Sequence, residues 1–319
     1  MAEIYDLAII GAGPAGLSAG LYAGRAKLNT IIFEKNKPGG QIATTQEVAN
    51  VPGSIFGGDG IATTGPDLTA RMVKQSDEFG ATRVSENVES VDFSGDVKKI
   101  NTNNGSYEAR AVIIAGGASP RKLGVPGEKE LTGKGVSYCA TCDGAFFEEM
   151  EVLVVGGGYS AAEEAMFLTK LCSKVTILVR EDKFSCAASV VDKVNANDKI
   201  EVKFNTEITE IKGDGIVEAA TLRNRETGEE YEFTVDDDFG VFGVFVFVGF
   251  EPQTDLYKGK VELDQWGYLL TDDNMKTNVE GVYGAGDIRP KLLRQVVTAM
   301  NDGAIAATAA EKYIDDKFH

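Results

Sequence analysis

Two segments of the chain consist of an unbroken apolar run that leads directly into a glycine-rich turn. Residues 7–10 read Leu-Ala-Ile-Ile and precede Gly-Ala-Gly-Pro-Ala-Gly, and residues 152–155 read Val-Leu-Val-Val and precede Gly-Gly-Gly. A short, wholly apolar run bounded by glycine is typical of a parallel strand that is buried on both faces. Because an alanine-rich stretch and a second apolar run follow each turn, both segments predict strand–helix–strand units.

The first unit has the spacing expected of a dinucleotide site. Its turn has the form Gly-x-Gly-x-x-Gly, and the next residues predict a helix from about Pro14 to Ala26. Such a turn lets backbone N–H groups approach a pyrophosphate at the helix N-terminus. Glu34 stands 18 residues after Gly16, where its carboxylate can accept hydrogen bonds from ribose hydroxyls. The alternative is a glycine-rich turn that binds no ligand.

The remaining pattern predicts how the two units are connected. Residues around 109–115 and from 201 to 235 predict meander-like strands, and the run 241–250, rich in β-branched and aromatic residues, predicts a buried strand. An alanine-rich helix is expected from about residue 293 to 313. We predict an α/β fold with two Rossmann-like, three-layer ββα nucleotide-binding domains, the second inserted in the first. The expected domains comprise residues 1–117 with 245–319, and residues 118–244.

Composition narrows the functional classes. A chain of 319 residues with 43 % hydrophobic residues can bury the cores of two domains. No apolar run reaches the roughly 18 residues of a membrane helix, and no cleavable leader precedes the first strand, so we expect a soluble cytoplasmic protein. The net charge of -17 argues against general nucleic-acid binding. Four cysteines are too few for a secreted disulfide scaffold and fit a reducing compartment.

Two of these cysteines are spaced as a redox pair. Cys139 and Cys142 lie in a Cys-Ala-Thr-Cys-Asp run just ahead of the second unit. In a CxxC pair one thiolate attacks a partner's disulfide and the other resolves the mixed disulfide. Asp143 is the candidate acid, because the only histidine is His319, the last residue. A zinc site would need about four ligands, and without a second CxxC or an internal histidine no metal is predicted.

Several short segments match one family of flavoproteins. They are Gly11-Ala-Gly-Pro-Ala-Gly16, Gly39-Gly-Gln41, Glu47-Val-Ala-Asn50, Pro52-Gly53, Cys139-Ala-Thr-Cys-Asp143, Glu251-Pro252, Gly286-Asp287 and Arg294-Gln-Val296. With them, nearly the whole chain resembles the low-molecular-weight, thioredoxin-reductase type of flavoprotein disulfide reductases. The resemblance implies FAD as cofactor, thioredoxin as substrate and a homodimer. It also implies an FAD domain built from both chain ends, an inserted dithiol domain, and rotation between the two.

Position by position, the resemblance assigns roles to individual residues. Cys142 would face the flavin, Cys139 would attack thioredoxin, and Asp143 would be the acid. Asp287 would hold the ribityl or pyrophosphate region of FAD. The family's frequent Ala-Thr-Gly reads Ala-Gly-Gly at 115–117 here, so one threonine hydroxyl is missing. The residues expected to bind FAD are Gly11, Gly13, Pro14, Ala15, Glu34, Lys35, Gly40, Gln41, Asn50, Val88, Ala115, Gly116, Asp287, Arg294, Gln295 and Val296.

The second glycine loop departs from the NADPH-dependent members of the family. Those carry Gly-Gly-Gly-Asp-Ser and a later His-Arg-Arg-Asp-x-x-Arg cluster that receives the 2′-phosphate. Here Tyr159 replaces the small acid, Arg180 remains, and the other three cationic or imidazole positions are Val179, Glu181 and Ser185. Losing two arginine contacts at roughly 1.5–3 kcal/mol each removes about two to four decades of affinity. The inserted domain is therefore predicted to hold a degenerate NAD(P)H site.

This pattern is similar to that of the ferredoxin-dependent flavin thioredoxin reductases, which keep FAD and CxxC but lack the nicotinamide site. We expect reduced ferredoxin as the electron donor, because a step from roughly -400 mV to roughly -270 mV releases about 6 kcal/mol for two electrons. One alternative is a reductase of a thioredoxin or peroxiredoxin system that uses NADH or NADPH, with Glu181 holding a free 2′-hydroxyl of NADH. Another is a flavin-bound redox sensor or regulatory interaction protein whose dithiol does not turn over.

Two further hypotheses concern the surface and the end of the chain. An acidic ferredoxin would need a local basic patch, although ordinary solvated side chains are the simpler interpretation. The second hypothesis is that Phe318 or His319 covers the flavin or gates donor access, where a frayed terminus is the ordinary expectation. The candidates for the basic patch are Arg25, Lys27, Lys35, Lys37, Arg289, Lys291 and Arg294.

Overall fold

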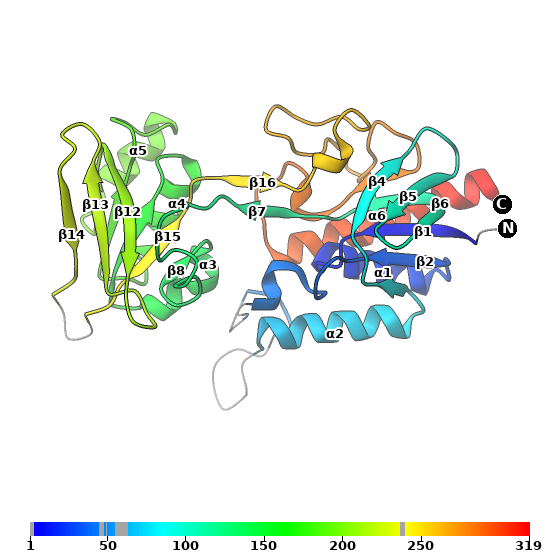
Figure 1. The fold of residues 1–319 in the computed structure, drawn as a ribbon, viewed down its shortest axis with the longest axis horizontal. Helices are drawn as coiled ribbons and strands as arrows, with labels where there is room; N and C mark the ends of the chain where they lie inside the picture. Colours follow the sequence, from blue (N-terminus) through cyan, green and yellow to red (C-terminus); the bar gives the residue numbers. More distant parts are fainter. Residues whose placement is uncertain (1–2, 45–47, 49, 55–62, 237–239) are drawn as a thin grey trace. The chain divides into compact units, whose positions relative to one another are not determined.

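The structure is a computed structural model that describes residues 3–44, 48, 50–54, 63–236 and 240–319. In the segment 47–50 quoted above, Glu47 and Ala49 lie outside the described residues. The chain divides into two compact units, residues 1–119 with 251–319 and residues 120–250. The second unit is thus an insertion that the chain enters and leaves once (Figure 1). The predicted α/β fold is confirmed.

The first unit is built on a central sheet whose middle strands are buried. Its strands are β1 (Ile4–Ile10), β2 (Thr30–Phe33), β3 (Thr82–Val84), β4 (Val88–Asp92), β5 (Lys98–Thr102), β6 (Ser106–Ile114) and β17 (Val282–Gly284). The order is β3-β2-β1-β6-β5-β4, and β17 also pairs with β6. β1 runs parallel to both β2 and β6. β5 pairs antiparallel with the start of β6 and β17 pairs parallel with its end, so β6 has two neighbours along one edge.

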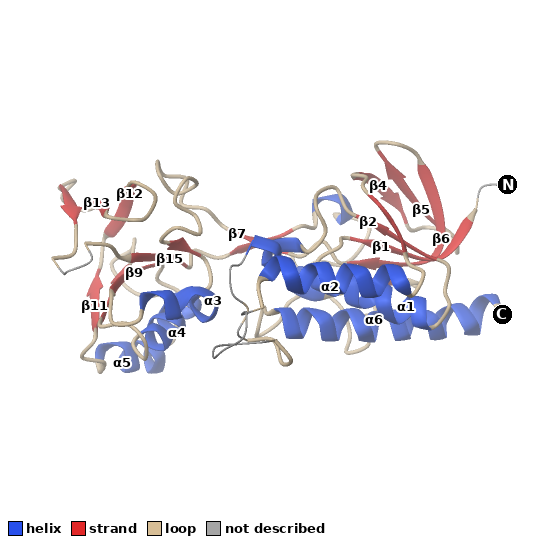
Figure 2. Ribbon diagram, turned by 90° about the horizontal axis from the view of Figure 1, so that it is seen from below, coloured by secondary structure: helices blue, strands red, loops and turns tan. Residues whose placement is uncertain are grey.

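Three helices lie on one face of this sheet (Figure 2). They are α1 (Pro14–Arg25), α2 (Gly65–Glu78) and α6 (Val296–Phe318). α1 packs directly on α6, and Gly303 permits this approach, because a Cβ there would lie 2.1 Å from the carbonyl oxygen of Ala15. Leu17 and Ala306 belong to the buried core between helices and sheet. A second buried cluster, which includes Phe33, lies on the opposite face.

α6 begins three residues later and ends five residues later than the predicted helix. A capping box fixes the start: the Gln295 side chain accepts from the N–H of Thr298, and the Thr298 hydroxyl accepts from the N–H of Gln295 at 3.2 Å. At the other end, Lys317 pairs with Asp96 at 2.7 Å and with Glu280 at 3.0 Å. These ion pairs attach the last turn of the helix to the rest of the first unit.

The end of α6 lies far from the start of this helix, where the flavin is expected. Phe318 packs edge-on against the Tyr313 ring, and the guanidinium of Arg110 lies 5.4 Å over the Phe318 ring. Arg110 is the middle residue of β6 and lies opposite the first half of the parallel β1, whereas Gly11 follows the end of β1. A helix of 23 residues spans about 34 Å. The hypothesis that Phe318 or His319 covers the flavin is therefore wrong for the flavin site of the same chain.

The second unit has two sheets and a layer of helices. The parallel sheet has the order β11-β10-β9-β15-β8, and the antiparallel sheet has the order β12-β13-β14. One buried cluster fills the space between the parallel sheet and the helices, and another joins the two sheets, which gives three layers. The elements are β8 (Val136–Ser137), α3 (Ala140–Asp143), β9 (Glu151–Val155), α4 (Tyr159–Leu168), β10 (Lys174–Leu178), α5 (Ala188–Asn195), β11 (Ile200–Lys203), β12 (Thr206–Lys212), β13 (Ala219–Asn224), β14 (Glu230–Phe233) and β15 (Gly243–Val246).

Both crossings between the units lie in a two-stranded ladder formed by β7 (Ala118–Pro120) and β16 (Phe250–Pro252). The apolar run 241–250, predicted as one strand, is therefore divided between β15 and β16. The division occurs at Gly249, whose φ of +106° is a conformation that glycine adopts readily, and whose carbonyl accepts from the N–H of Arg121 at 2.9 Å. Among the described residues, no helix is both long and apolar enough to span a membrane.

Candidate active site

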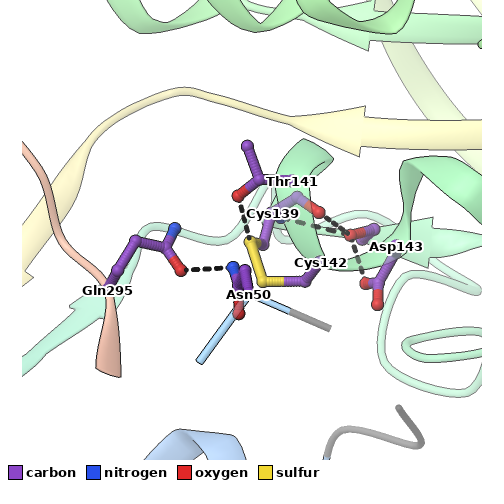
Figure 3. The surroundings of a disulfide bond; sticks show 7 residues. Asn50, Cys139, Thr141, Cys142, Asp143 and Gln295 are labelled. Atoms are coloured by element: carbon purple, nitrogen blue, oxygen red, sulfur yellow. Dashed lines mark hydrogen bonds between the residues drawn. A yellow bond between two sulfur atoms is a disulfide. The ribbon is translucent and has the colours of Figure 1, made fainter. Parts of the chain in front are cut away.

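Cys139 and Cys142 form a disulfide at a one-turn helix of the second unit (Figure 3). Their Cα atoms are 5.3 Å apart. Cys139 is the N-cap of α3, and its carbonyl accepts from the N–H of Cys142 at 3.3 Å and of Asp143 at 3.1 Å. Ala140, between the two cysteines, is buried in the core of the unit. This single helical turn brings the predicted pair and the predicted acid together.

The Asp143 carboxylate is held by a serine that the sequence analysis did not single out. The hydroxyl of Ser137 donates to Oδ2 of Asp143 at 2.6 Å, and its oxygen accepts from the N–H of Cys139 at 3.1 Å. Burial raises the pKa of Asp143, and the smaller effect of the Ser137 hydrogen bond lowers it. A carboxyl group with a raised pKa, next to Cys142 in the chain, suits proton transfer to a departing thiolate.

The other two cysteines are part of the core. Cys172 is buried and Cys186 is partly buried in the cluster between the parallel sheet and the helices. Burial raises the pKa of Cys172 to about 11, so its thiol stays protonated and is a poor nucleophile. Within the part of the chain that the structure describes, no group of three or more His, Cys, Asp or Glu side chains is placed to hold a metal ion.

The first glycine turn forms a tight cradle in the first unit. Gly11 has a φ of +110°, and a Cβ there would lie 2.4 Å from the carbonyl oxygen of Ala115. A Cβ on Gly40 would lie 3.1 Å from the Cα of Gly13, so the turn and this segment pass close to each other. Gly13 caps α1 without a side chain, and Pro14 is the first helical residue. The N-terminus of α1 can therefore offer its backbone N–H groups to a pyrophosphate.

Glu34 braces this cradle from the end of β2. Its Oε2 accepts from the N–H of Ala12 at 2.9 Å, and its Oε1 accepts from the N–H of Asn36 at 3.0 Å. A carboxylate oxygen can accept more than one hydrogen bond, so both oxygens can still accept from ribose hydroxyls. The predicted role of Glu34 agrees with this placement.

Asp287, Asn50 and Gln295 are three further residues predicted to bind FAD. Oδ1 of Asp287 is buried and has no hydrogen-bond partner among the described residues. Burial raises the pKa of Asp287, while Lys291 and Arg294 lower it. A buried acceptor without a donor is costly, and a hydroxyl of FAD would satisfy it. Asn50 donates to Oε1 of Gln295 at 3.0 Å, which joins two predicted FAD contacts (Figure 3). These residues fit FAD.

The other residues predicted to contact FAD lie in different surroundings. The side-chain amide of Gln41 donates to the carbonyl of Ala118. The guanidinium of Arg294 lies 4.6 Å over the ring of Tyr268. The Val88 side chain is buried in the core, so only its backbone could contact a cofactor. Four further residues are predicted to contact FAD. Ala15 lies in the cradle and Lys35 beside Glu34, whereas Gly116 follows β6 and Val296 begins α6.

The second glycine loop is packed by residues that replace the phosphate-binding positions. A Cβ on Gly157 would lie 2.7 Å from Cγ1 of Val179, so this side chain packs on the loop. Ser185 donates from its N–H at 2.7 Å and from its hydroxyl at 3.1 Å to the Gly157 carbonyl. Tyr159 is the first residue of α4 and is 52 % exposed. Its ring thus stands at the helix end where a pyrophosphate would approach.

Glu181 interacts with two arginines, of which sequence analysis identified only one. Nε of Arg180 donates to Oε1 of Glu181 at 3.0 Å. Nη1 of Arg225 lies 3.7 Å from the same oxygen and donates to the Arg180 carbonyl at 3.2 Å. Arg225 follows β13, 45 positions after Arg180, and belongs to no motif. Glu181 therefore pairs with both arginines, and Nε of Arg225 also lies 3.5 Å from Oε2 of Glu207.

Two members of the candidate basic patch are committed to internal ion pairs. Lys291 and Arg289 lie 2.8 Å and 3.3 Å from Oδ2 of the buried Asp302. The Lys291 side chain is only 9 % exposed, so the prediction that these two residues form a docking surface is wrong. The members that remain exposed are Arg25, Lys27, Lys35 and Lys37.

A cradle of the flavin-binding kind and a CxxC disulfide define a flavin-linked disulfide reductase. The family described as pyridine nucleotide-disulphide oxidoreductase matches residues 5–303. A thioredoxin reductase of Peptoclostridium litorale is 58 % identical, with 100 % of this chain and 99 % of the relative covered. The crystal structure of thioredoxin reductase from Streptococcus pyogenes is 41 % identical with a TM-score of 0.88, covering 98 % of this chain and 99 % of that one.

The chain therefore belongs to the pyridine nucleotide-disulphide oxidoreductase family and, within it, to the low-molecular-weight thioredoxin reductases. FAD is the cofactor, and the chain is a flavoprotein oxidoreductase, as predicted.

The more specific resemblance to ferredoxin-dependent members has weaker support. A solved ferredoxin-flavin thioredoxin reductase from Clostridium acetobutylicum is 28 % identical with a TM-score of 0.52, covering 99 % of this chain and 100 % of that one. The Peptoclostridium litorale and Streptococcus pyogenes proteins are both more similar and are named simply as thioredoxin reductases. The family and the cofactor are thus confirmed, and the electron donor stays a prediction.

Proposed function

We propose that the chain reduces the disulfide of thioredoxin through FAD and the Cys139–Cys142 pair, with Asp143 as the acid. The observation that carries this proposal is the helical turn that holds the disulfide and a buried carboxyl group together. We assign FAD to residues 1–119 with 251–319 and the dithiol to residues 120–250. By analogy with the family, the protein is a cytoplasmic homodimer.

FAD, when bound, supplies the electron pair, and the protein's own residues manage the sulfur and proton steps. Two electrons and two protons convert the Cys139–Cys142 disulfide to two thiols. Cys139 loses its proton to solvent, and its thiolate attacks the thioredoxin disulfide. A mixed disulfide forms, and Asp143 protonates the thiolate that leaves. Asp143 then takes the proton of Cys142, whose thiolate attacks the sulfur of Cys139. The Cys139–Cys142 bond re-forms, and the second thioredoxin thiolate takes a proton from solvent.

The dithiol assignment can be tested without knowing the physiological electron donor. The enzyme is reduced anaerobically with dithionite, freed of excess reductant and mixed with oxidised thioredoxin, and the thioredoxin thiols are counted. Wild type should yield two thiols per turnover, whereas Cys139→Ser should yield none and Cys142→Ser should stop at the mixed disulfide with one thioredoxin thiol released. Both variants should still bind FAD. Cys186→Ser, a cysteine change in the same unit, is the matched control and should behave as wild type. Thiol formation by the Cys139→Ser variant would refute the assignment.

For the electron donor we propose reduced ferredoxin. Val179 and Ser185 fill space beside the second glycine loop instead of offering cations, and Tyr159 stands at the start of α4. The ferredoxin-flavin thioredoxin reductase of Clostridium acetobutylicum, which matches this chain over its length, is a precedent for such a donor within this fold. NADH is the second candidate, favoured by the exposed carboxylate of Glu181, which could accept from a free 2′-hydroxyl.

Anaerobic mixing distinguishes the donors. We expect NADPH and NADH to leave the flavin absorbance unchanged, and reduced ferredoxin to bleach it and to support thioredoxin reduction. Oxidised ferredoxin is the control for binding without electron transfer. Rapid bleaching by NADH, with no effect of ferredoxin, would establish the second candidate. Rapid bleaching by NADPH would contradict both candidates.

A further inference from the structure

We infer that Ser137 is a positioning residue for proton transfer: its hydroxyl holds the Asp143 carboxyl so that the transferable proton is carried on Oδ1. This inference rests on the proposed function, in which Asp143 is the acid. Nothing in the CxxC motif itself identifies Ser137, which lies two residues ahead of the first cysteine.

The backbone of Ser137 is fixed by the parallel sheet. Ser137 is the second residue of β8 and pairs with Phe245 of β15. Only 5 % of Ser137 is exposed. A buried hydroxyl on a paired strand has few positions to adopt, so Ser137 can hold the geometry of its partners.

The contacts of Ser137 determine where its single hydrogen points. Its oxygen accepts from the N–H of Cys139 at 3.1 Å, so the hydroxyl hydrogen must point to another group. Two acceptors are in reach, Oδ2 of Asp143 at 2.6 Å and the carbonyl of Cys139 at 3.3 Å. The carboxylate oxygen is closer and forms a charge-assisted bond, so it takes the hydrogen.

This direction assigns the proton of Asp143 to one oxygen. Oδ2 already accepts the Ser137 hydrogen, and a second hydrogen on Oδ2 would compete with it. A proton that Asp143 takes up is therefore carried on Oδ1, which leaves it available for transfer. The same serine oxygen accepts from the N–H of Cys139, so one side chain links the acid to the first cysteine of the pair.

Removing the hydroxyl has a predictable effect on Asp143. The Ser137 hydrogen bond opposes the effect of burial on the carboxyl, so Ser137→Ala leaves burial to act alone and the pKa of Asp143 rises. A hydrogen bond to a charged group corresponds to an upward shift of about one to two pH units. The midpoint for Asp143 ionisation should move to higher pH by that amount.

The test is an infrared titration of the Asp143 carboxyl in the oxidised holoenzyme, with Asp143→Asn used to identify the band. Ser137→Ala should raise the midpoint by about one to two pH units and weaken hydrogen bonding to the protonated form. Ser137→Thr keeps the hydroxyl and should restore the wild-type midpoint, and Ser189→Ala, at an exposed serine of the same unit, should not change it. If Ser137→Ala fails to fold, the comparison of Ser137→Thr with Ser137→Val replaces it.

The pH profile of single-turnover thiol transfer gives the functional readout and should move in the same direction as the infrared midpoint. An unchanged infrared midpoint in folded Ser137→Ala would overturn the inference. Wild-type transfer rates with an unshifted profile in Asp143→Asn would instead refute Asp143 as the acid. That result concerns the proposed function, and the infrared titration would still decide the role of Ser137.

Discussion

Glu181 pairs with two arginines, Arg180 and Arg225, beside the second glycine loop. In Glu181→Ala, Arg180 loses its ion pair with Glu181, and Arg225 loses one of its two carboxylate partners and keeps Glu207. We predict that this variant binds 2′,5′-ADP about one to two decades more tightly at low salt, since a recovered contact to a charged group is worth roughly 1.5–3 kcal/mol. Calorimetric titration measures the change. AMP, which lacks the 2′-phosphate, serves as the control ligand, and Asp192→Ala as the control variant. Unchanged affinity for 2′,5′-ADP in Glu181→Ala would contradict the prediction.

At the scale of residues, the sequence identifies site residues that belong to a motif. It does not identify site residues that only folding brings next to that motif. Cys139, Cys142 and Asp143 are adjacent in sequence, so their association follows from one helical turn. Ser137 lies in a strand of two residues that has no recognisable pattern. Arg225 reaches Glu181 from a turn after β13, and only the packing of the antiparallel sheet reveals that contact.

Among the elements, the packing of α1 on α6 depends on one glycine. In Gly303→Ala the new Cβ would meet the carbonyl oxygen of Ala15 at 2.1 Å, a backbone atom that cannot rotate away. We expect a destabilisation of about 1–3 kcal/mol from overpacking, in part offset by the roughly 1 kcal/mol that alanine gains over glycine in a helix.

Hydrogen exchange of peptides from α1 and α6 would measure this destabilisation. Thr308→Ala, at an exposed position of the same helix, is the matched control and should keep or slightly increase protection. Equal protection of both helices in wild type and Gly303→Ala would show that the two helices can separate without cost.

The predicted elements agree best where a local signal marks their ends. The first helix was expected over residues 14–26 and is α1, because proline and glycine mark its start. The last helix was placed three residues early, since the Gln295–Thr298 capping box consists of residue types that also occur within helices. The run 241–250 is expected from sequence as one strand, because glycine permits a positive φ without requiring it, so Gly249 alone does not mark a break.

For the whole molecule, each unit has cores of its own, so binding of FAD should stabilise the two units unequally. We predict that FAD at about 100 times its dissociation constant stabilises the first unit by about 2.7 kcal/mol and leaves the second almost unchanged. Hydrogen exchange of FAD-free protein, measured with and without added FAD, reports the stability of both units. Peptides from β1 and α6 report on the first unit, and peptides from β9 and β10 report on the second. AMP is the control ligand. Equal protection in both units would contradict the assignment of FAD to the first unit alone.

The insertion also has a consequence for synthesis of the protein on the ribosome. β17 and α6, which complete the sheet and the helical layer of the first unit, are translated only after residues 120–250. Since domains generally fold as units while the chain emerges, the first unit to begin is the last to finish. The cysteine pair therefore acquires its folded surroundings before the chain has a finished site for FAD. Until α6 leaves the ribosome, β1, β2 and β6 stay exposed in the nascent chain and must not pair with the wrong strands.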